Sequence, residues 1–327
     1  MIGQDTLLVA LLRLVDRLPA PPPAKRRRGR ARTCPGRLSL KALVVMIVRH
    51  LHSPYELLAV VAQPPAEMTT LRGRLTLPDG RYPSRRTWER RPAALPDTLP
   101  AQIGRLGRHL VALIDPWAGR GRAAAVDSTV LRAKGGVWRK KAREAGAVPR
   151  TSIDTEAHRT TSGWHGWAYG RKLHLVTTVA AVWLPLAAEL TAANAADNEV
   201  APALLDALPA EARFVLGDRH DNAPQVREAC ARAARALVTS RYGRYPHTAA
   251  GVEVRRGFHQ RRPLASENFN GPFKGIFDVR GAAPTKGLTD TRRFALGAVL
   301  VYQLTLWHRH EHDRDLRVGL DPFLKAA

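Results

Sequence analysis

Two aspartates occupy positions where an α/β protein places its chemistry. Asp127 lies inside the apolar run AAAVDSTVL, and Asp218 directly follows the apolar run FVLG. A charge in a buried strand costs several kcal/mol unless it is paired or binds a metal. Two acids at adjacent strand ends can hold Mg²⁺, which binds one or two carboxylates together with phosphate oxygens. Taken singly, each Asp also fits a turn or a helix cap.

A third acid is expected further along the chain. Glu267 precedes Lys274 by seven residues, about two helical turns, so both side chains would share one helix face. A carboxylate for metal and a cation for phosphate suit phosphodiester chemistry. Pro272 lies between them and should kink or break the helix, and we expect any kink to displace Lys274 rather than Glu267. Glu253 and Asp278 are the alternatives for the third acid.

The elements that must position these acids form a mixed α/β pattern. Short apolar runs predict strands, and longer segments between and after them predict helices. The strands are expected at 123–131, 173–181, 186–191, 213–216 and 236–239, and the helices at 198–208, 223–234 and 289–308. Further helices are expected upstream, at 7–18, within 39–62 and at 97–114, with caps at Ser53 and Ser84.

Four stretches in a fixed order carry a family likeness. They are Val126-Asp127-Ser128-Thr129 with Lys134 and Gly135, the segment Tyr169 to Leu175, the segment Leu190 to Leu205 followed by LGDRHDN, and Ser266-Glu267 with Lys274 before the long apolar helix. Each stretch is weak alone, but the ordered set over residues 120–310 is specific. It resembles a DDE transposase of a bacterial insertion sequence, whose catalytic domain is an RNase H-like mixed sheet flanked by helices.

The resemblance implies a mechanism. Asp127, Asp218 and Glu267 would be catalytic and hold two Mg²⁺ ions, with Mn²⁺ as a substitute, to cut and join DNA strands. Lys274 and Arg262 would contact phosphates. The partners would be double-stranded DNA, as terminal inverted repeats and target, and a second copy of the chain in a DNA-bound homodimer.

Two rival functions remain open at this point. A metal-dependent nuclease of the same fold would cut without joining, and a decayed transposase would bind DNA as a repressor. Four side chains cluster before the second strand: Trp164, His165, Trp167 and Tyr169. For these, packing against the sheet is favoured over stacking on an unpaired base.

The chain is strongly basic, with 52 Lys and Arg against 28 Asp and Glu, a net charge of +24. Such a charge favours nucleic acid as a partner.

Residues 1–119 are expected to form a helical, basic region that binds DNA ends. Residues 120–310 are expected to form the catalytic domain, and residues 311–327 a tail. A helical layer with a solvated basic face is the alternative for the first region. The residues expected to contact DNA there are Lys25, Arg26, Arg27, Arg28, Arg85 and Arg86.

The sequence predicts neither a membrane protein nor a protein of an oxidising compartment. The apolar run at residues 7–18 is interrupted by Arg13 and Asp16, and no window reaches the ~18 apolar residues of a membrane span. Cys34 and Cys230 are too few for a disulfide framework. The expected location is the bacterial cytoplasm, in association with the nucleoid.

Overall fold

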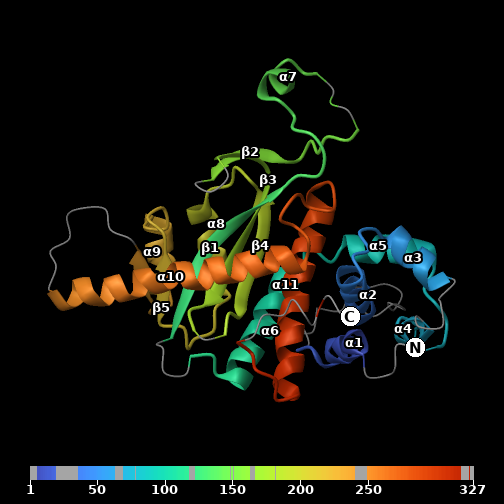
Figure 1. Ribbon diagram of the computed structural model, residues 1–327, viewed down its shortest axis with the longest axis horizontal. Coiled ribbons are helices and arrows are strands. Elements are labelled where there is room, and N and C mark those ends of the chain that lie inside the picture. The colour runs from blue at the N-terminus through green and yellow to red at the C-terminus, as the bar shows by residue number, and fades with distance from the viewer. Residues whose placement is uncertain are drawn as a thin grey trace, which may run out of the picture.

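A mixed β-sheet runs through the centre of the computed structural model, with helices on both faces (Figure 1). The structure describes residues 6–19, 36–62, 69–77, 79–117, 122–147, 149, 151–162, 166–180, 182–239, 249–317 and 324. Within these residues the sheet has six strands. They are β1 (Ala123–Arg132), β2 (His158–Ser162), β3 (Gly166–Thr178), β4 (Pro185–Ala192), β5 (Phe214–Gly217) and β6 (Ala236–Thr239).

The strand order defines the fold. β1 lies between β3, which is antiparallel to it, and β5, which is parallel to it. β6 extends the parallel side beyond β5. β2 and β4 both pair antiparallel with β3, along its first and second parts respectively. The order β4-β3-β1-β5-β6, in which β3 opposes the other strands, is the mixed sheet of an RNase H-like fold and confirms the predicted fold class.

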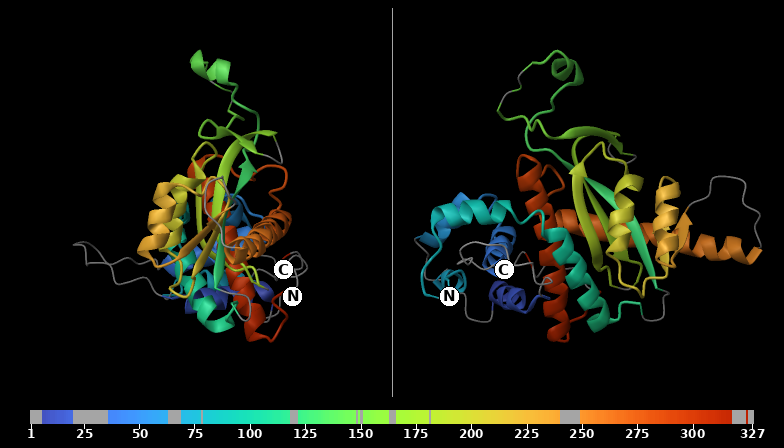
Figure 2. Two further views of the ribbon diagram at one scale, coloured as in Figure 1. Left: turned by 90° about the vertical axis from the view of Figure 1, so that its left-hand side faces the viewer. Right: turned by 180° about the vertical axis from the view of Figure 1, so that it is seen from behind.

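Helices cover the two faces of the sheet. α8 (Asp197–Asp206) and α9 (Pro224–Arg232) lie on one face, and α10 (Ala249–Ile276) crosses the other, as the edge-on view in Figure 2 shows. The predicted strands and helices between residues 123 and 239 are confirmed to within a few residues, except that β3 begins well before residue 173. β2 and the short helix α7 (Lys140–Glu144) had no counterpart in the sequence prediction.

Helix α10 corrects the expectation of a break at Pro272. The helix runs without interruption to Ile276. Phe269 and Phe273 on either side of the proline are buried, with ring centroids 5.3 Å apart, and Phe269 also contacts Tyr302 at 4.9 Å. Burial of these rings offsets the hydrogen bond that Pro272 cannot donate, so tertiary packing overrides the local preference.

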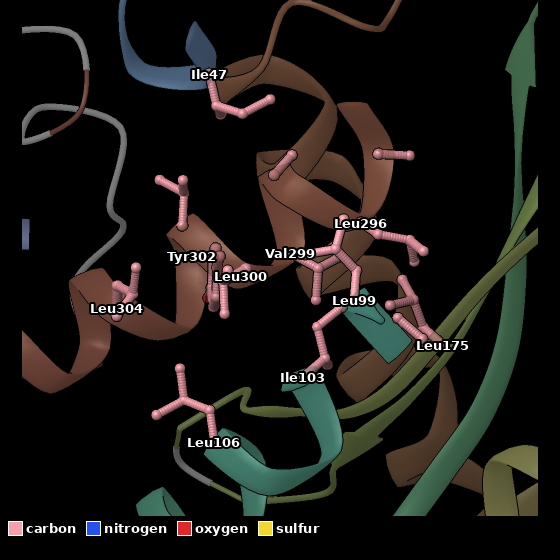
Figure 3. Close-up of a cluster of buried hydrophobic side chains, with 14 of the residues drawn as sticks. Ile47, Leu99, Ile103, Leu106, Leu175, Leu296, Val299, Leu300, Tyr302 and Leu304 are labelled. Atoms are coloured by element: carbon pink, nitrogen blue, oxygen red, sulfur yellow. The ribbon is translucent and has the colours of Figure 1, made fainter. Parts of the chain in front are cut away.

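Helix α11 (Leu288–Glu311) joins the two halves of the molecule. Its buried side chains surround it rather than forming one stripe, and they pack against N-terminal helices and the sheet (Figure 3). Gln303, fully buried, donates to the carbonyl oxygens of Ile103 at 3.0 Å and Pro185 at 2.8 Å. The N-terminal helices are α1 (Leu7–Arg17), α2 (Gly36–Val48), α3 (Pro54–Ala62), α4 (Thr69–Arg74), α5 (Arg85–Ala93) and α6 (Leu99–Ile114).

These helices and the sheet share one hydrophobic cluster. The core is therefore continuous across residue 119, and the division expected there stays a prediction about function. Both predicted caps are present. At the start of α3 the amide of Glu56 donates to the Ser53 hydroxyl at 3.2 Å, and that hydroxyl donates to the Glu56 carboxylate at 3.1 Å. Ser84 accepts from the amide of Thr87 at 3.4 Å at the start of α5.

The chain makes a long excursion between β1 and β2, over residues 133–157. We call this segment the β1–β2 arm. Figure 1 shows it projecting beyond the end of the sheet, with α7 at its far end.

Candidate active site

Asp127 lies on the face of the sheet that α10 covers. Oδ1 of Asp127 is 3.1 Å from Nη2 of Arg262, and its Oδ2 accepts from Nδ2 of Asn270 at 3.3 Å. The Asp127 side chain is 25% exposed. The charge inside this strand is therefore paired, as burial requires, and it also remains open to a ligand from solvent.

Asp218 lies beside Asp127 because of the strand register. Ala125 of β1 pairs with Leu216 of the parallel strand β5. Asp127 lies two residues after Ala125, and Asp218 lies two residues after Leu216. Parallel neighbouring strands bring equivalent positions to the same end of the sheet. The predicted juxtaposition of the two acids thus follows from the backbone alone.

A tight turn fixes the Asp218 side chain. Its Oδ1 accepts from the amides of His220 at 2.6 Å and Asp221 at 3.2 Å, and its own amide donates to Oδ2 of Asp221 at 2.8 Å. A Cβ on Gly217 would lie 2.6 Å from Cβ of Asp221, so only glycine fits at that position. Asp218 is therefore held in one orientation at the end of β5.

Asp221 is the most perturbed acid of the site. It is 4% exposed, and burial together with the neighbouring charge of Asp218 raises its pKa to about 7. Its Oδ1 is buried without a hydrogen-bond partner among the described residues. Asp221 lines a hollow of about 10 Å³, room for a single water or ion, together with Asp127, Asp218 and Asp197.

Helix α10 adds cations along β1. Besides Arg262, Lys274 is half-buried and lies within electrostatic reach of Asp127. Burial and the charge of Arg132 lower the pKa of Lys274, against the opposing pull of Asp127. Lys274 is thus not displaced by Pro272, contrary to the expectation from the sequence.

Glu267 is exposed and lies three residues before Asn270, a separation of about 4.5 Å along the helix axis. In the described part of the chain no group of three or more His, Cys, Asp or Glu side chains is arranged to hold a metal ion. In this turn of α10 the side chain of Asn270 contacts Asp127. Of the alternatives, Asp278 is exposed beyond the end of α10, and Glu253 belongs to the first part of the helix.

A second network, with no counterpart in the sequence prediction, borders the same hollow from the other face of the sheet. His174 pairs with Ser128 across β1 and β3, so its side chain leaves the sheet on the face opposite that of Asp127. Its Nδ1 is 3.2 Å from Asp197, which is also 3.2 Å from Nζ of Lys172. Burial opposes ionisation of Asp197, but the hydrogen bond from His174 and the charge of Lys172 lower its pKa to about 2. Polar residues alternating with leucine in β3 were the available signal.

Residues 118–263 match the family described as a transposase DDE domain. This stretch, a little under half of the chain, is therefore similar to a transposase DDE domain. No curated protein and no solved structure matches the chain. The matched segment includes Asp127, Asp218 and Arg262, and it ends shortly before Glu267.

Transposase DDE domains typically use a divalent metal, and the donors present fit one. Asp127 and Asp218 supply hard oxygen ligands at one end of the sheet, and Asp221, whose buried Oδ1 has no partner among the described residues, lines the same hollow. Two carboxylates together with substrate phosphate match what Mg²⁺ binds in proteins. Asp127 and Asp218 are therefore the residues that would hold it.

The predicted DNA-binding residues of the N-terminal region fall into two groups. Lys25, Arg26, Arg27 and Arg28 lie outside the described residues. Arg85 and Arg86 are exposed at the start of α5, and Arg85 pairs with Glu89 at 2.7 Å. Trp88 of the same helix is buried in the core, so α5 is anchored with its basic side chains outward. None of the described helices has the length and apolar character needed to cross a membrane.

Proposed function

We propose that the protein is a transposase that cuts DNA strands at the ends of a bacterial insertion sequence and joins the freed 3′-hydroxyl to target DNA. The observation that carries the proposal is the register of β1 and β5, which sets Asp127 and Asp218 side by side under cations of α10. Paired carboxylates beside cations suit phosphoryl transfer, which depends on positioning and on neutralising phosphate charge.

Asp127, Asp218 and Glu267 would hold two Mg²⁺ ions, with Mn²⁺ as a substitute. Glu267 qualifies because it lies within one turn of Asn270, the residue that touches Asp127. Ions held by these carboxylates would supply two things: activation of a water or a 3′-hydroxyl, and stabilisation of the leaving oxygen of an in-line displacement.

The protein's own side chains have separate tasks in this scheme. Asp218 is held by the turn at Gly217, so its carboxylate needs no reorganisation to bind a ligand. Lys274 and Arg262 neutralise phosphate oxygens, and Arg262 can do so only by releasing or sharing Asp127. The exposed Arg85 and Arg86, with Lys25 to Arg28, would hold terminal inverted repeats in a homodimer on DNA.

The test is an assay of nicking and joining on duplexes that carry the DNA flanking the gene. With Mg²⁺ the unaltered protein should nick the duplex at the element's ends and join the 3′-ends to a plasmid. Asp127→Asn and Asp218→Asn should abolish both steps, since each removes one charged ligand and keeps the shape. Asp206→Asn, an acid on α8 with a 63% exposed side chain, is the matched control and should retain full activity.

Two outcomes would replace the proposal. Nicking without joining would favour the metal-dependent nuclease, which shares the same acids. Specific binding of the flanking DNA without nicking in either Mg²⁺ or Mn²⁺ would favour the repressor.

A further inference from the structure

The β1–β2 arm is a built element with a defined base. Gly135 on the outgoing leg has φ +88°, and a Cβ there would lie 2.0 Å from the carbonyl oxygen of Ser152 on the returning leg. The two legs therefore cross in contact, which only glycine allows. Nζ of Lys134 donates to the carbonyl of Pro284 at 2.9 Å, and that of Lys286 donates to the carbonyl of Thr151.

A buried ion pair fastens the returning leg. Arg171 of β3 donates to both carboxylate oxygens of Asp154, at 2.6 and 3.0 Å, and both side chains are 1% exposed. Asp154 also accepts from the amide of Gly287 at 3.1 Å, just before α11. Trp138 of the outgoing leg packs against a small buried cluster of Ala133, Ala157 and Tyr169. The base of the arm is therefore anchored to the sheet and to α11.

The far end of the arm is strongly basic. Residues 133–147 hold five basic side chains and one acidic one, a net charge of +4. Arg139, Lys140, Lys141 and Arg143 are exposed. Only Lys140 has an ion-pair partner within the described part of the chain, Glu144 at 3.6 Å. Exposed cations that exceed the nearby acids, on a segment that projects from the sheet, suit a polyanion rather than the fold itself.

An exposed tryptophan lies on the neighbouring hairpin. Trp167 of β3 is 75% exposed, so the packing expected of it is wrong, although Tyr169 is buried as expected. Trp167 pairs with Thr161 and Tyr169 with Arg159, which places Trp167 and the exposed Arg159 on one face of the β2–β3 hairpin. An aromatic surface beside arginine is a nucleic-acid-binding combination.

The arm lies at a definite distance from the acids. It begins beyond Arg132, five residues after Asp127, or about 17 Å along β1. B-DNA advances about 3.4 Å per base pair, so this distance corresponds to about five base pairs. A duplex that runs along β1 with a phosphate at Asp127 would pass the arm five or more base pairs away.

We propose that the β1–β2 arm is a second DNA-binding element, which grips the backbone of duplex DNA five or more base pairs from the bond that is cut. The inference rests on the proposed function for the position of that bond, but the binding itself needs no catalysis. Arg139, Lys140, Lys141 and Arg143 contact phosphates, and Trp167 with Arg159 extends the surface along the hairpin.

Binding is measured by fluorescence anisotropy with a 40-base-pair duplex in EDTA, where no cleavage can occur. The arm variant carries Lys140→Gln, Lys141→Gln and Arg143→Gln. The matched control carries Arg213→Gln, Arg227→Gln and Arg232→Gln, which removes the same charge from exposed positions just before β5 and on α9. The arm variant should bind about tenfold more weakly, and its slope of log K against log salt should be shallower by about 2.7, three phosphates at about 0.9 each. The control should change affinity less than threefold.

Three outcomes decide the matter. A photo-crosslinker placed at Lys141 should react with DNA five or more base pairs from the nick, and reaction only at the nick would overturn the assigned position. Equal affinity and equal salt slope for the two triple variants would overturn the proposal, whatever the cleavage assay shows. Loss of binding to anionic vesicles or to an acidic peptide, with DNA binding unchanged, would assign the arm to another partner. Circular dichroism verifies that both variants fold.

Discussion

Oδ1 of Asp127 lies 3.1 Å from the guanidinium of Arg262, a side chain supplied by the helix that crosses the sheet. The Asp127 carboxylate is thus the ion-pair partner of Arg262 and also a candidate ligand of a metal ion. Metal and Arg262 compete for it, since both are attracted to the same charge.

Arg262→Ala should therefore separate metal binding from cleavage. Removal of the competing cation should lower the Mg²⁺ concentration for half-maximal nicking by about two- to fivefold. This change in affinity corresponds to the free energy that a partly exposed ion pair contributes. The maximal rate should fall, because a phosphate contact is also lost. Titration of nicking with Mg²⁺ gives both quantities, and an unchanged or raised Mg²⁺ requirement would show that Arg262 does not compete.

The neighbouring positions of α10 should differ sharply in their effects. Glu267→Gln should reduce Mg²⁺-dependent nicking by well over a hundredfold, more than the ~10–100-fold typical of groups that only orient a ligand. Lys274→Ala should slow nicking moderately, and Asn270→Ala should have the smallest effect. Single-turnover nicking rates rank the three. A Glu267→Gln rate close to that of Asn270→Ala would remove Glu267 from the metal site.

Asp197 should stabilise the fold in a pH-dependent way. Its pKa falls from 3.8 to about 2 on folding, so its charge contributes about 2 kcal/mol above pH 4, and this is lost as the pH falls through 2. Asp197→Asn should lower the free energy of unfolding by that amount at pH 6, with the difference shrinking below pH 4. Urea unfolding at a series of pH values tests this, and a difference independent of pH would contradict it.

The buried pair at the base of the arm should be more sensitive. Arg171→Met leaves Asp154 buried without its ion-pair partner, which should cost about 3–5 kcal/mol. Glu89→Ala breaks the exposed pair with Arg85 and should cost less than about 1 kcal/mol. Urea unfolding of the two variants gives the comparison. Similar costs would mean that the Asp154 carboxylate finds other partners.

DNA binding should survive loss of the acids. Asp127→Asn and Asp218→Asn remove negative charge, so their affinity for a duplex should equal or exceed that of the unaltered protein and should fall steeply with salt. Neutralising Lys25 to Arg28 should weaken binding to all sequences by a similar factor. Anisotropy with two unrelated duplexes distinguishes this from base-specific recognition, which would be lost for one sequence only.

The fold and the site differ in how far the sequence predicts them. The strands and the pair Asp127–Asp218 follow from short-range patterns, because apolar runs define strands and parallel register then aligns the acids. Helix α10 does not follow, because its continuity through Pro272 depends on burial of Phe269 and Phe273 against a helix far along the chain.

Side-chain partners across the sheet are equally invisible to sequence patterns. Asn270 and His174 owe their places to the crossing of α10 and to the pairing of β3, which no local spacing encodes. The β1–β2 arm was missed for a similar reason. The ion pair at its base joins Asp154 of the arm to Arg171 of β3, which are 17 residues apart in the sequence. In addition, the charged, glycine-containing sequence of the arm has no periodicity.

The position of α11 has a consequence for synthesis of the protein. This helix carries the apolar surface that α1, α2 and α6 pack against, and it also packs on β4. It leaves the ribosome after every one of these elements, at about 5–20 residues per second, so their apolar faces stay uncovered for many seconds. The nascent chain should therefore depend on chaperones until α11 emerges, and it should acquire its fold after translation rather than region by region.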